Sequence, residues 1–382
     1  MSSGRDSTRV VPVAVIGPGR VGRELLHRLI KDDAYYRSRY GLEFRVTSVC
    51  DSTQGISRPV DGFRKEDLES IIAIKREGGS LTDFSRESAI RTPSFESIAQ
   101  QAEPGLIAID CTASEETTPL LLKLIKTGGR VVLANKKPLV GELSVFKQLT
   151  ASPAACRWET TVASCLPIIS ILNRMTASGD HIASISGVLS GTMSYLMTQI
   201  EQGERFSESL QRAMKLGYTE PDPREDLLGH DQARKALILA RTAGWDLDLS
   251  KIKVVPLLPG PFCELGRAEF LQRLPELDRG FLEKTRECGQ EGAVLRHGVE
   301  ITPDRGTVEL MEVASQSPIG RLLNNNNLVQ VESRTFSNPL VVQGRGAGAA
   351  ATAAGNLSDL VELAFTRSED QLQEQDRQGK NA

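Results

Sequence analysis

Residues 10–30 read VVPVAVIGPGRVGRELLHRLI, and this stretch decides the fold of the first part of the chain. Its opening β-branched run is typical of a buried parallel strand, and an amphipathic helical pattern follows the glycines. Between strand and helix, Gly17, Gly19 and Gly22 form the motif G-x-G-x-x-G. In order, they permit a tight turn, close approach of the backbone to a pyrophosphate, and close packing of helix on strand. We expect a dinucleotide site here, since a helix N-terminus favours negative charge; a structural glycine turn is the alternative.

The second strand, FRVTSVCD at 44–51, ends in Asp51. An acid at this strand end commonly binds the adenosine ribose hydroxyls, although this one comes later than the roughly 20 residues of the usual spacing. The insertion at 31–41 accounts for the delay. Asp51 as a simple turn residue is an alternative, and Arg20 or Arg58 would instead meet a 2′-phosphate. NAD and NADP therefore both remain open as cofactors.

Two further buried strands with polar ends are expected at 106–114 and 130–138, with an amphipathic helix between them. This alternation of strands and helices predicts a doubly wound parallel sheet. Ligands of such sheets bind at the carboxyl ends of the strands, where Thr112 and Lys136 stand. Adjacent lysines are commonly a solvated turn, so the position at a strand end is what favours a functional role for Lys136.

A second region starts near residue 158, where Glu159 precedes a long apolar run. Residues 181–200 alternate as a strand and then turn through Ser190-Gly191-Thr192 into a helix. Such a turn of small residues offers backbone amides of Gly191 and Thr192 to a carboxylate or phosphate. Thr192 as a helix N-cap is the alternative, and both interpretations are compatible.

Residues 213–235, AMKLGYTEPDPREDLLGHDQARK, concentrate acids before a single lysine, Lys235. The acids are Glu220, Asp222, Glu225, Asp226 and Asp231. Acids at this density usually form a solvated loop, but this one leads into an apolar helix at 233–240 that we expect to be buried. An ordered carboxylate cluster beside one lysine suits an enzyme that holds a small amino acid and moves a proton. Asp231 and Lys235 share a helix face, so a structural ion pair is the alternative.

Composition limits the classes of function. The chain has 382 residues, enough for two or three domains, and a formal net charge of −3, which argues against a dedicated nucleic-acid binder. No stretch approaches ~18 uncharged apolar residues, so we expect no membrane span. The N-terminus has no apolar signal core, and none of the six cysteines forms a CxxC pair. We therefore expect a cytoplasmic protein with free thiols.

The segment 217–235 resembles the signature of homoserine dehydrogenases, which joins G-Y-T-E-P-D-P to D-L-x-G-x-D-x-x-x-K. The remaining motifs follow in order: GPGRVG, DCTAS, ANKKP, E-x-x-V-x-x-x-L-P-I-I from Glu159, SGT, and GAGAAATAAG near the end. The resemblance implies reversible NAD(P)-dependent interconversion of L-homoserine and L-aspartate 4-semialdehyde, in threonine, methionine and isoleucine biosynthesis. It also implies a short monofunctional homodimer without kinase or regulatory domain.

The fold implied by the resemblance is a Rossmann-like doubly wound parallel sheet plus an α+β catalytic and dimerisation region. We expect the nucleotide domain at 1–155 with a return segment at 338–366, and the catalytic region at 156–337. Residues 367–382 lack apolar periodicity and are expected to form a disordered tail.

The resemblance also implies roles for single residues. Proton transfer falls on Lys235, with Lys136 as a candidate second cation. Substrate binding falls on Glu220 and Asp231, with Asp226 and Tyr218 close by. Cofactor contacts fall on Gly19, Arg20, Val21, Thr112, Lys136 and Gly348. Monovalent cation binding, usually of sodium, falls on Glu159 and the carbonyls of Val162, Ser164 and Leu166. Relatives commonly read E-A-T-V-G-A-G-L-P there, whereas this chain reads ETTVASCLP and lacks those glycines.

Two other functions fit part of these residues. One is another Rossmann oxidoreductase that acts on an amino-acid aldehyde or an imine, against which only the acidic segment argues. The other is a catalytically inactive dinucleotide sensor, against which the intact set of Glu220, Asp231 and Lys235 argues.

Overall fold

The computed structural model describes residues 8–85, 89–92, 95, 98 and 105–366. The chain divides into two compact units: unit 1 contains residues 1–161 and 348–382, and unit 2 contains residues 162–347. The tail expected at 367–382 lies outside the described residues.

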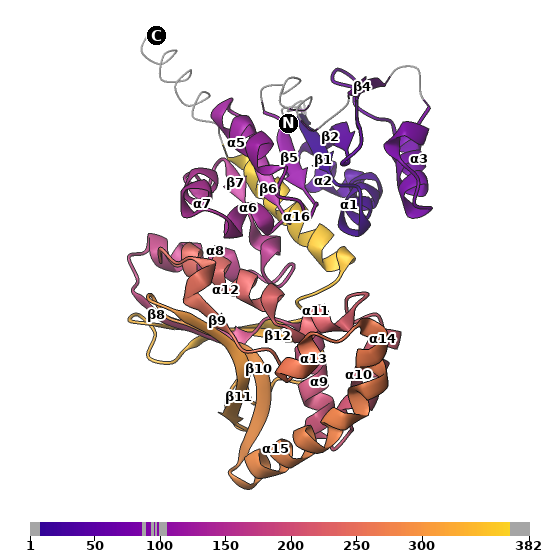
Figure 1. Ribbon diagram of the computed structural model, residues 1–382. Coiled ribbons are helices and arrows are strands. Elements are labelled where there is room, and N and C mark those ends of the chain that lie inside the picture. Colours follow the sequence, from indigo (N-terminus) through magenta and orange to yellow (C-terminus); the bar gives the residue numbers. More distant parts are fainter. Residues whose placement is uncertain (1–7, 86–88, 93–94, 96–97, 99–104, 367–382) are drawn as a thin grey trace. The chain divides into compact units, whose positions relative to one another are not determined.

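Unit 1 is built on a seven-stranded sheet with the order β4-β3-β2-β1-β5-β6-β7 (Figure 1). Its strands are β1 Arg9–Ile16, β2 Leu42–Cys50, β3 Gly55–Ser57, β4 Ile90–Thr92, β5 Ile107–Asp110, β6 Arg130–Leu133 and β7 Cys156–Arg157. The strands from β2 through β1 to β7 are parallel, and β3 and β4 add an antiparallel edge. The chain runs outward from β1 to β4 and returns to β5 beside β1, so the order switches at the point where such sheets bind ligands. The predicted Rossmann-like fold is confirmed.

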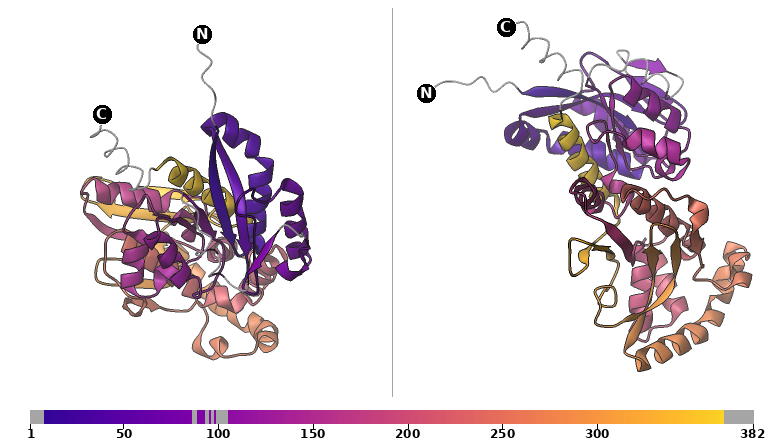
Figure 2. Two further views of the ribbon diagram at one scale, coloured as in Figure 1. Left: turned by 90° about the horizontal axis from the view of Figure 1, so that it is seen from above. Right: turned by 90° about the vertical axis from the view of Figure 1, so that its left-hand side faces the viewer.

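The helices of unit 1 bury apolar faces against this sheet. They are α1 Arg20–Lys31, α2 Asp33–Tyr40, α3 Lys65–Arg76, α5 Thr118–Lys126, α6 Lys137–Val140, α7 Leu143–Thr150 and α16 Ala349–Phe365, with 3₁₀ turns η1 Leu81–Asp83 and η2 Glu159–Thr161. Leu25 of α1 and Leu360 of α16 belong to one core with Val13 of β1. Burying each such side chain contributes about 1.5–3 kcal/mol. Figures 1 and 2 show α1 and α16 side by side, although over 300 residues separate them in sequence.

Unit 2 contains a six-stranded sheet with the order β13-β12-β8-β10-β11-β9. Its strands are β8 Ile182–Val188, β9 Ile252–Val254, β10 Ala293–Ile301, β11 Gly306–Ala314, β12 Asn327–Ser333 and β13 Leu340–Gly344. All neighbours are antiparallel except β9 and β11. We expected the return to the nucleotide domain from residue 338, but β13 pairs with β12, and unit 1 resumes only at Gly348.

The helices of unit 2 include the apolar helix expected at 233–240. They are α8 Ile168–Ala177, α9 Gly191–Glu201, α10 Phe206–Lys215, α11 Pro223–Leu227, α12 His230–Thr242, α13 Gly260–Cys263, α14 Arg267–Arg273 and α15 Asp278–Gln290, with 3₁₀ turns η3 Leu249–Lys251 and η4 Leu274–Leu277. In α12 every residue from Ala236 to Thr242 is buried, which confirms the prediction. In the part of the chain that the structure describes, no helix has the length and apolar character needed to cross a bilayer.

Candidate active site

The glycine motif forms the turn between β1 and α1. Gly17 has φ +83°, and a β-carbon there would lie 2.6 Å from the Thr112 side chain. A β-carbon on Gly22 would lie 2.3 Å from the Gly17 carbonyl oxygen, so this position needs glycine for helix and strand to pack. Gly19 is the N-cap of α1, carries no side-chain cap, and has open space around its α-carbon. The first amides of α1, which begins with Arg20 and Val21, thus lie in a turn suited to a pyrophosphate.

Asp51 follows β2, and its neighbours hold its carboxylate ionised. The carboxylate accepts hydrogen bonds from the Thr53 and Gln54 amides at 2.9 and 3.0 Å and forms an ion pair with Lys75 at 2.9 Å. Partial burial raises the pKa of Asp51, but hydrogen bonds from Thr53 and Lys75 outweigh this effect and hold the pKa at about 2. Arg58, the expected alternative phosphate partner, forms an ion pair with Asp67 at 3.1 Å.

A residue that sequence reasoning missed, Asp110, organises the ends of β5 and β6. This fully buried carboxylate accepts the amide and hydroxyl of Thr112 at 2.9 and 2.7 Å. It also accepts the Thr117 hydroxyl at 2.7 Å and the Asn135 side-chain amide at 3.0 Å. Asp110 therefore fixes the loop of Thr112 and the residue before Lys136, the N-cap of α6. The available signal was an acid ending an otherwise apolar strand.

Unit 1 also contains the candidate residues Gly348 and Glu159. Gly348 is the N-cap of α16, with φ +122° and open space around its α-carbon. Glu159 begins η2, and its amide donates to Asp359 of α16 at 3.1 Å. Burial, with the charge of Glu159 second, raises the pKa of Asp359 above its ordinary value.

The segment with the expected cation-binding carbonyls begins unit 2 and has an unusual backbone. Ala163 and Ser164 both have φ +56°, between the carbonyl positions Val162 and Leu166. The left-handed conformation costs an L-residue roughly 1–2 kcal/mol. Residue 163 is a glycine in the family pattern, so this chain keeps the conformation without the residue that adopts it freely. Backbone carbonyls survive such changes of side chain, and carbonyl oxygens are ligands that hard cations accept.

Replacing Ala163 by glycine is expected to raise the free energy of unfolding by about 0.5–1 kcal/mol. The gain comes from relief of the left-handed strain, less the larger backbone entropy that glycine loses on folding. Denaturant unfolding of the full chain measures it. Ala243→Gly is the matched control, because Ala243 has φ −71° and its replacement should only destabilise. If Ala163→Gly and Ala243→Gly lowered the free energy of unfolding equally, the backbone strain at Ala163 would be contradicted.

The SGT turn of unit 2 starts α9. The N-cap is Ser190, whose hydroxyl oxygen accepts the Met193 amide at 3.3 Å, so the interpretation of Thr192 as the cap is wrong. Thr192 is free for another contact because it lies inside the first turn. Its hydroxyl lies 2.6 Å from the Tyr218 carbonyl oxygen and 3.1 Å from the Asp226 carboxylate.

Asp226 ties the acidic segment to that turn. Its second carboxylate oxygen accepts the Glu220 amide at 2.8 Å. Burial raises the pKa of Asp226 to about 6, although hydrogen bonds from the Glu220 amide and Thr192 act in the opposite direction. Glu220 and Glu225 are both exposed. Asp222 caps α11 and accepts the Arg224 amide at 3.1 Å.

Lys235 is largely buried on α12 with its ammonium held at two points. The Nζ atom lies 2.8 Å from the Asp231 carboxylate and 2.8 Å from the Leu189 carbonyl oxygen. The ion pair that the four-residue spacing predicts is therefore present. The contact with Leu189 places Lys235 directly before the SGT turn. Within unit 2, hydrogen bonds connect Thr192, Tyr218, Glu220 and Asp226. Lys235 contacts Asp231 and the carbonyl of Leu189, two residues before Gly191.

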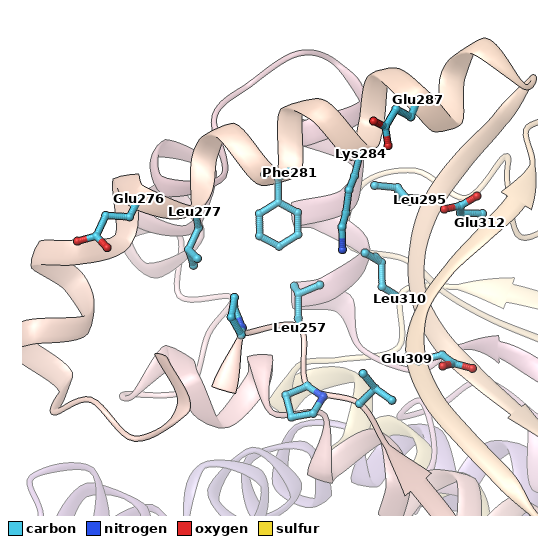
Figure 3. Close-up of a pocket in the computed structure, with 14 residues that line it drawn as sticks. Leu257, Glu276, Leu277, Phe281, Lys284, Glu287, Leu295, Glu309, Leu310 and Glu312 are labelled. Carbon is cyan, nitrogen blue, oxygen red and sulfur yellow. The ribbon is translucent and has the colours of Figure 1, made fainter. Parts of the chain in front are cut away.

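A cavity of about 620 Å³ lies elsewhere in unit 2, between α15 and strands β10 and β11. Figure 3 shows Phe281 and Lys284 pointing from α15 into it, with Leu257 and Leu310 opposite. None of the residues expected in the site lines this cavity.

Comparison with known proteins places these motifs in one family. The family model described as Homoserine dehydrogenase matches residues 167–361. Bifunctional aspartokinase/homoserine dehydrogenase 1 of Zea mays is 33% identical over 94% of this chain and 39% of its own length. Homoserine dehydrogenase of Saccharomyces cerevisiae is 29% identical over 94% of this chain and 99% of its own. A solved putative homoserine dehydrogenase from Archaeoglobus fulgidus shares the fold, with a TM-score of 0.74, 26% identity, and coverage of 93% and 99%.

The lengths of these relatives differ. The chain spans about two fifths of the bifunctional relatives, such as the Zea mays protein with 39% of its length covered. It spans nearly the whole of the yeast relative.

Proposed function

The chain belongs to the homoserine dehydrogenase family, and on this premise we propose that it catalyses the reversible NAD(P)-dependent interconversion of L-homoserine and L-aspartate 4-semialdehyde. The observation that carries the proposal is the position of Lys235, bonded to Asp231 and to the carbonyl before the SGT turn. This gives a proton carrier beside a helix start and a set of carboxylates. We extend the proposal to a role in threonine, methionine and isoleucine biosynthesis, in the cytoplasm.

Lys235 acts on the proton in the proposed mechanism. The dinucleotide, when bound, supplies or accepts a hydride at the carbon that carries the oxygen. In the reducing direction Lys235 gives a proton to the forming alkoxide, and in the oxidising direction it removes the hydroxyl proton. Removal requires a neutral amine, so homoserine oxidation is favoured at alkaline pH. Lys136 serves as the second cation of the site.

The carboxylates of unit 2 hold the substrate in this proposal. Glu220 and Asp231 bind the α-ammonium group, and Asp226 fixes the backbone of Glu220 for that task. The amides of Gly191 and Thr192 at the start of α9 receive the α-carboxylate. The Tyr218 carbonyl oxygen accepts the Thr192 hydroxyl, and Tyr218 is the last member of this substrate-binding set. Because the Glu220 backbone and the Asp231 carboxylate are held before the substrate arrives, less ordering entropy is lost on binding.

The dinucleotide lies on the glycine turn in this proposal, with contacts from Gly17, Gly19, Arg20, Val21, Gly22, Thr112, Lys136 and Gly348. The ionised Asp51 favours NAD, since a carboxylate accepts ribose hydroxyls and repels a 2′-phosphate. A monovalent cation, sodium, binds Glu159 and the carbonyls of Val162, Ser164 and Leu166. Two copies of the chain form a homodimer.

Replacing Asp51 by asparagine is expected to raise kcat/KM for NADP relative to NAD by about tenfold. The change removes the negative charge next to the 2′ position but keeps the shape of the side chain. Steady-state rates with each dinucleotide measure the ratio. Asp61→Asn is the control, an exposed acid beyond the same strand. An unchanged ratio would assign Asp51 to the turn alone.

Steady-state assay of the full chain tests the function itself. Formation of NADH or NADPH is followed with L-homoserine at alkaline pH, and the reverse reaction with L-aspartate 4-semialdehyde. A panel of other amino alcohols and amino-acid aldehydes accompanies both. Faster turnover of another member of the panel would favour a different oxidoreductase. Dinucleotide binding without any turnover would favour the sensor.

A further inference from the structure

Helix α12, which carries Asp231 and Lys235, begins without a side-chain cap. The N-cap of α12 is Gly229, in the left-handed conformation with φ +76°, and no side chain caps the helix. A capping side chain normally satisfies one of the first amides and fixes the direction of the first turn. The orientation of Asp231 therefore depends on what packs beneath this turn.

A buried polar pair lies beneath it. Gln232, 1% exposed, donates from its side-chain amide to Nδ1 of His297, 0% exposed on β10, at 2.8 Å. Acceptance at Nδ1 leaves the ring proton on Nε2 of a neutral imidazole. Burial lowers the pKa of His297 to about 4, so the acceptor persists at physiological pH. A β-carbon on Gly229 would lie 3.4 Å from the same ring.

A second contact of α12 reaches the end of the neighbouring strand. Strand β8, which pairs with β10 in antiparallel register, ends at Val188. Leu189 follows directly, and its carbonyl oxygen accepts the ammonium of Lys235. Helix α12 is thus held at two points that lie about one turn apart, to β10 through Gln232 and to the residue after β8 through Lys235.

We propose that His297 is a positioning residue for the reaction, which acts through Gln232 to orient the first turn of α12. This inference rests on the proposed function. Asp231 and Lys235 flank Gln232 on that turn, and their ion pair sets the place of the Nζ atom. A displacement of about 1 Å in a reacting group costs about 100-fold in rate. Loss of the hydrogen bond between Gln232 and His297 should therefore lower turnover even where the fold is retained.

A double replacement separates positioning from stability. His297→Leu or Gln232→Leu alone leaves one buried polar group without its partner and should lower the midpoint of denaturant unfolding. The double variant Q232L/H297L removes both groups and should return the midpoint close to that of the wild type. Its kcat for homoserine oxidation is nevertheless expected to stay at least about tenfold low. The ascending limb of its pH–rate profile is expected to shift, because that limb reports loss of the proton from the catalytic base. Dinucleotide affinity should not change.

Rescue and control variants complete the experiment. His297→Asn presents a carboxamide oxygen to Gln232 and should restore most of kcat. Ser209→Ala, a buried polar change on α10, should leave kcat and its pH profile unchanged. A double variant with wild-type kcat and pH profile would overturn the positioning role while the proposed function stands. A wild type that does not oxidise homoserine would overturn the proposed function, and the inference with it.

Discussion

Replacing Lys235 by methionine is expected to lower kcat for homoserine oxidation by about 10²–10⁴-fold, the usual contribution of a positioned acid or base. Methionine keeps the length and apolar body of the side chain but cannot carry a proton. The Leu189 carbonyl and Asp231 lose a partner in this variant, so its unfolding midpoint must be measured beside its turnover.

Dinucleotide binding and a second lysine provide the controls for this result. Affinity for NAD or NADP should stay within about twofold, because the glycine turn belongs to unit 1. Lys215→Met, which alters an exposed lysine at the end of α10, should turn over normally. If turnover were unchanged in the Lys235→Met variant, Lys235 would have no role beyond its structural ion pair with Asp231.

Replacing Glu220 by glutamine is expected to raise KM for homoserine by about 10–100-fold and to change KM for the dinucleotide little. The variant loses the charge that faces the substrate ammonium, and hydrogen bonds to charged groups contribute about 1.5–3 kcal/mol. The Glu220 amide still binds Asp226 at 2.8 Å, so the loop is preserved. Initial rates over a range of both substrates measure the two constants.

The neighbouring acid Glu225 supplies the matched control for Glu220. Glu225 is exposed on α11, five residues after Glu220, and Glu225→Gln should leave both constants unchanged. If Glu220→Gln altered only the dinucleotide constant, the proposed ammonium clamp would be wrong.

Features that depend on neighbours in sequence could be predicted. The strand, turn and helix of the glycine motif follow from an apolar run and three glycines within 21 residues. The ion pair of Asp231 and Lys235 follows from helical spacing, and the burial of α12 from its apolar composition. In each case the deciding interactions span about one helical turn or one strand.

Features that depend on distant residues could not be predicted. Asp110 gains its role from Thr117 and Asn135, which lie 7 and 25 residues away. Gln232 and His297 lie 65 residues apart. The place of β13 is set by pairing with β12, because an edge strand with alternating residues fits either sheet in sequence alone. Thr192 was expected as an N-cap, but the hydroxyl of Ser190, two residues earlier, suits that position equally well and takes it.

The contribution of α16 to the core of unit 1 has a consequence for protein synthesis. Leu357, Leu360 and Leu363 of α16 help to complete a core whose members outside this helix are made over 190 residues earlier. Chains usually fold domain by domain as they leave the ribosome. Here unit 2, which is continuous from 162 to 347, is available for folding first. The nascent nucleotide domain must wait for α16 with apolar surface exposed, so a ribosome stalled before residue 349 should present a natural target for chaperones.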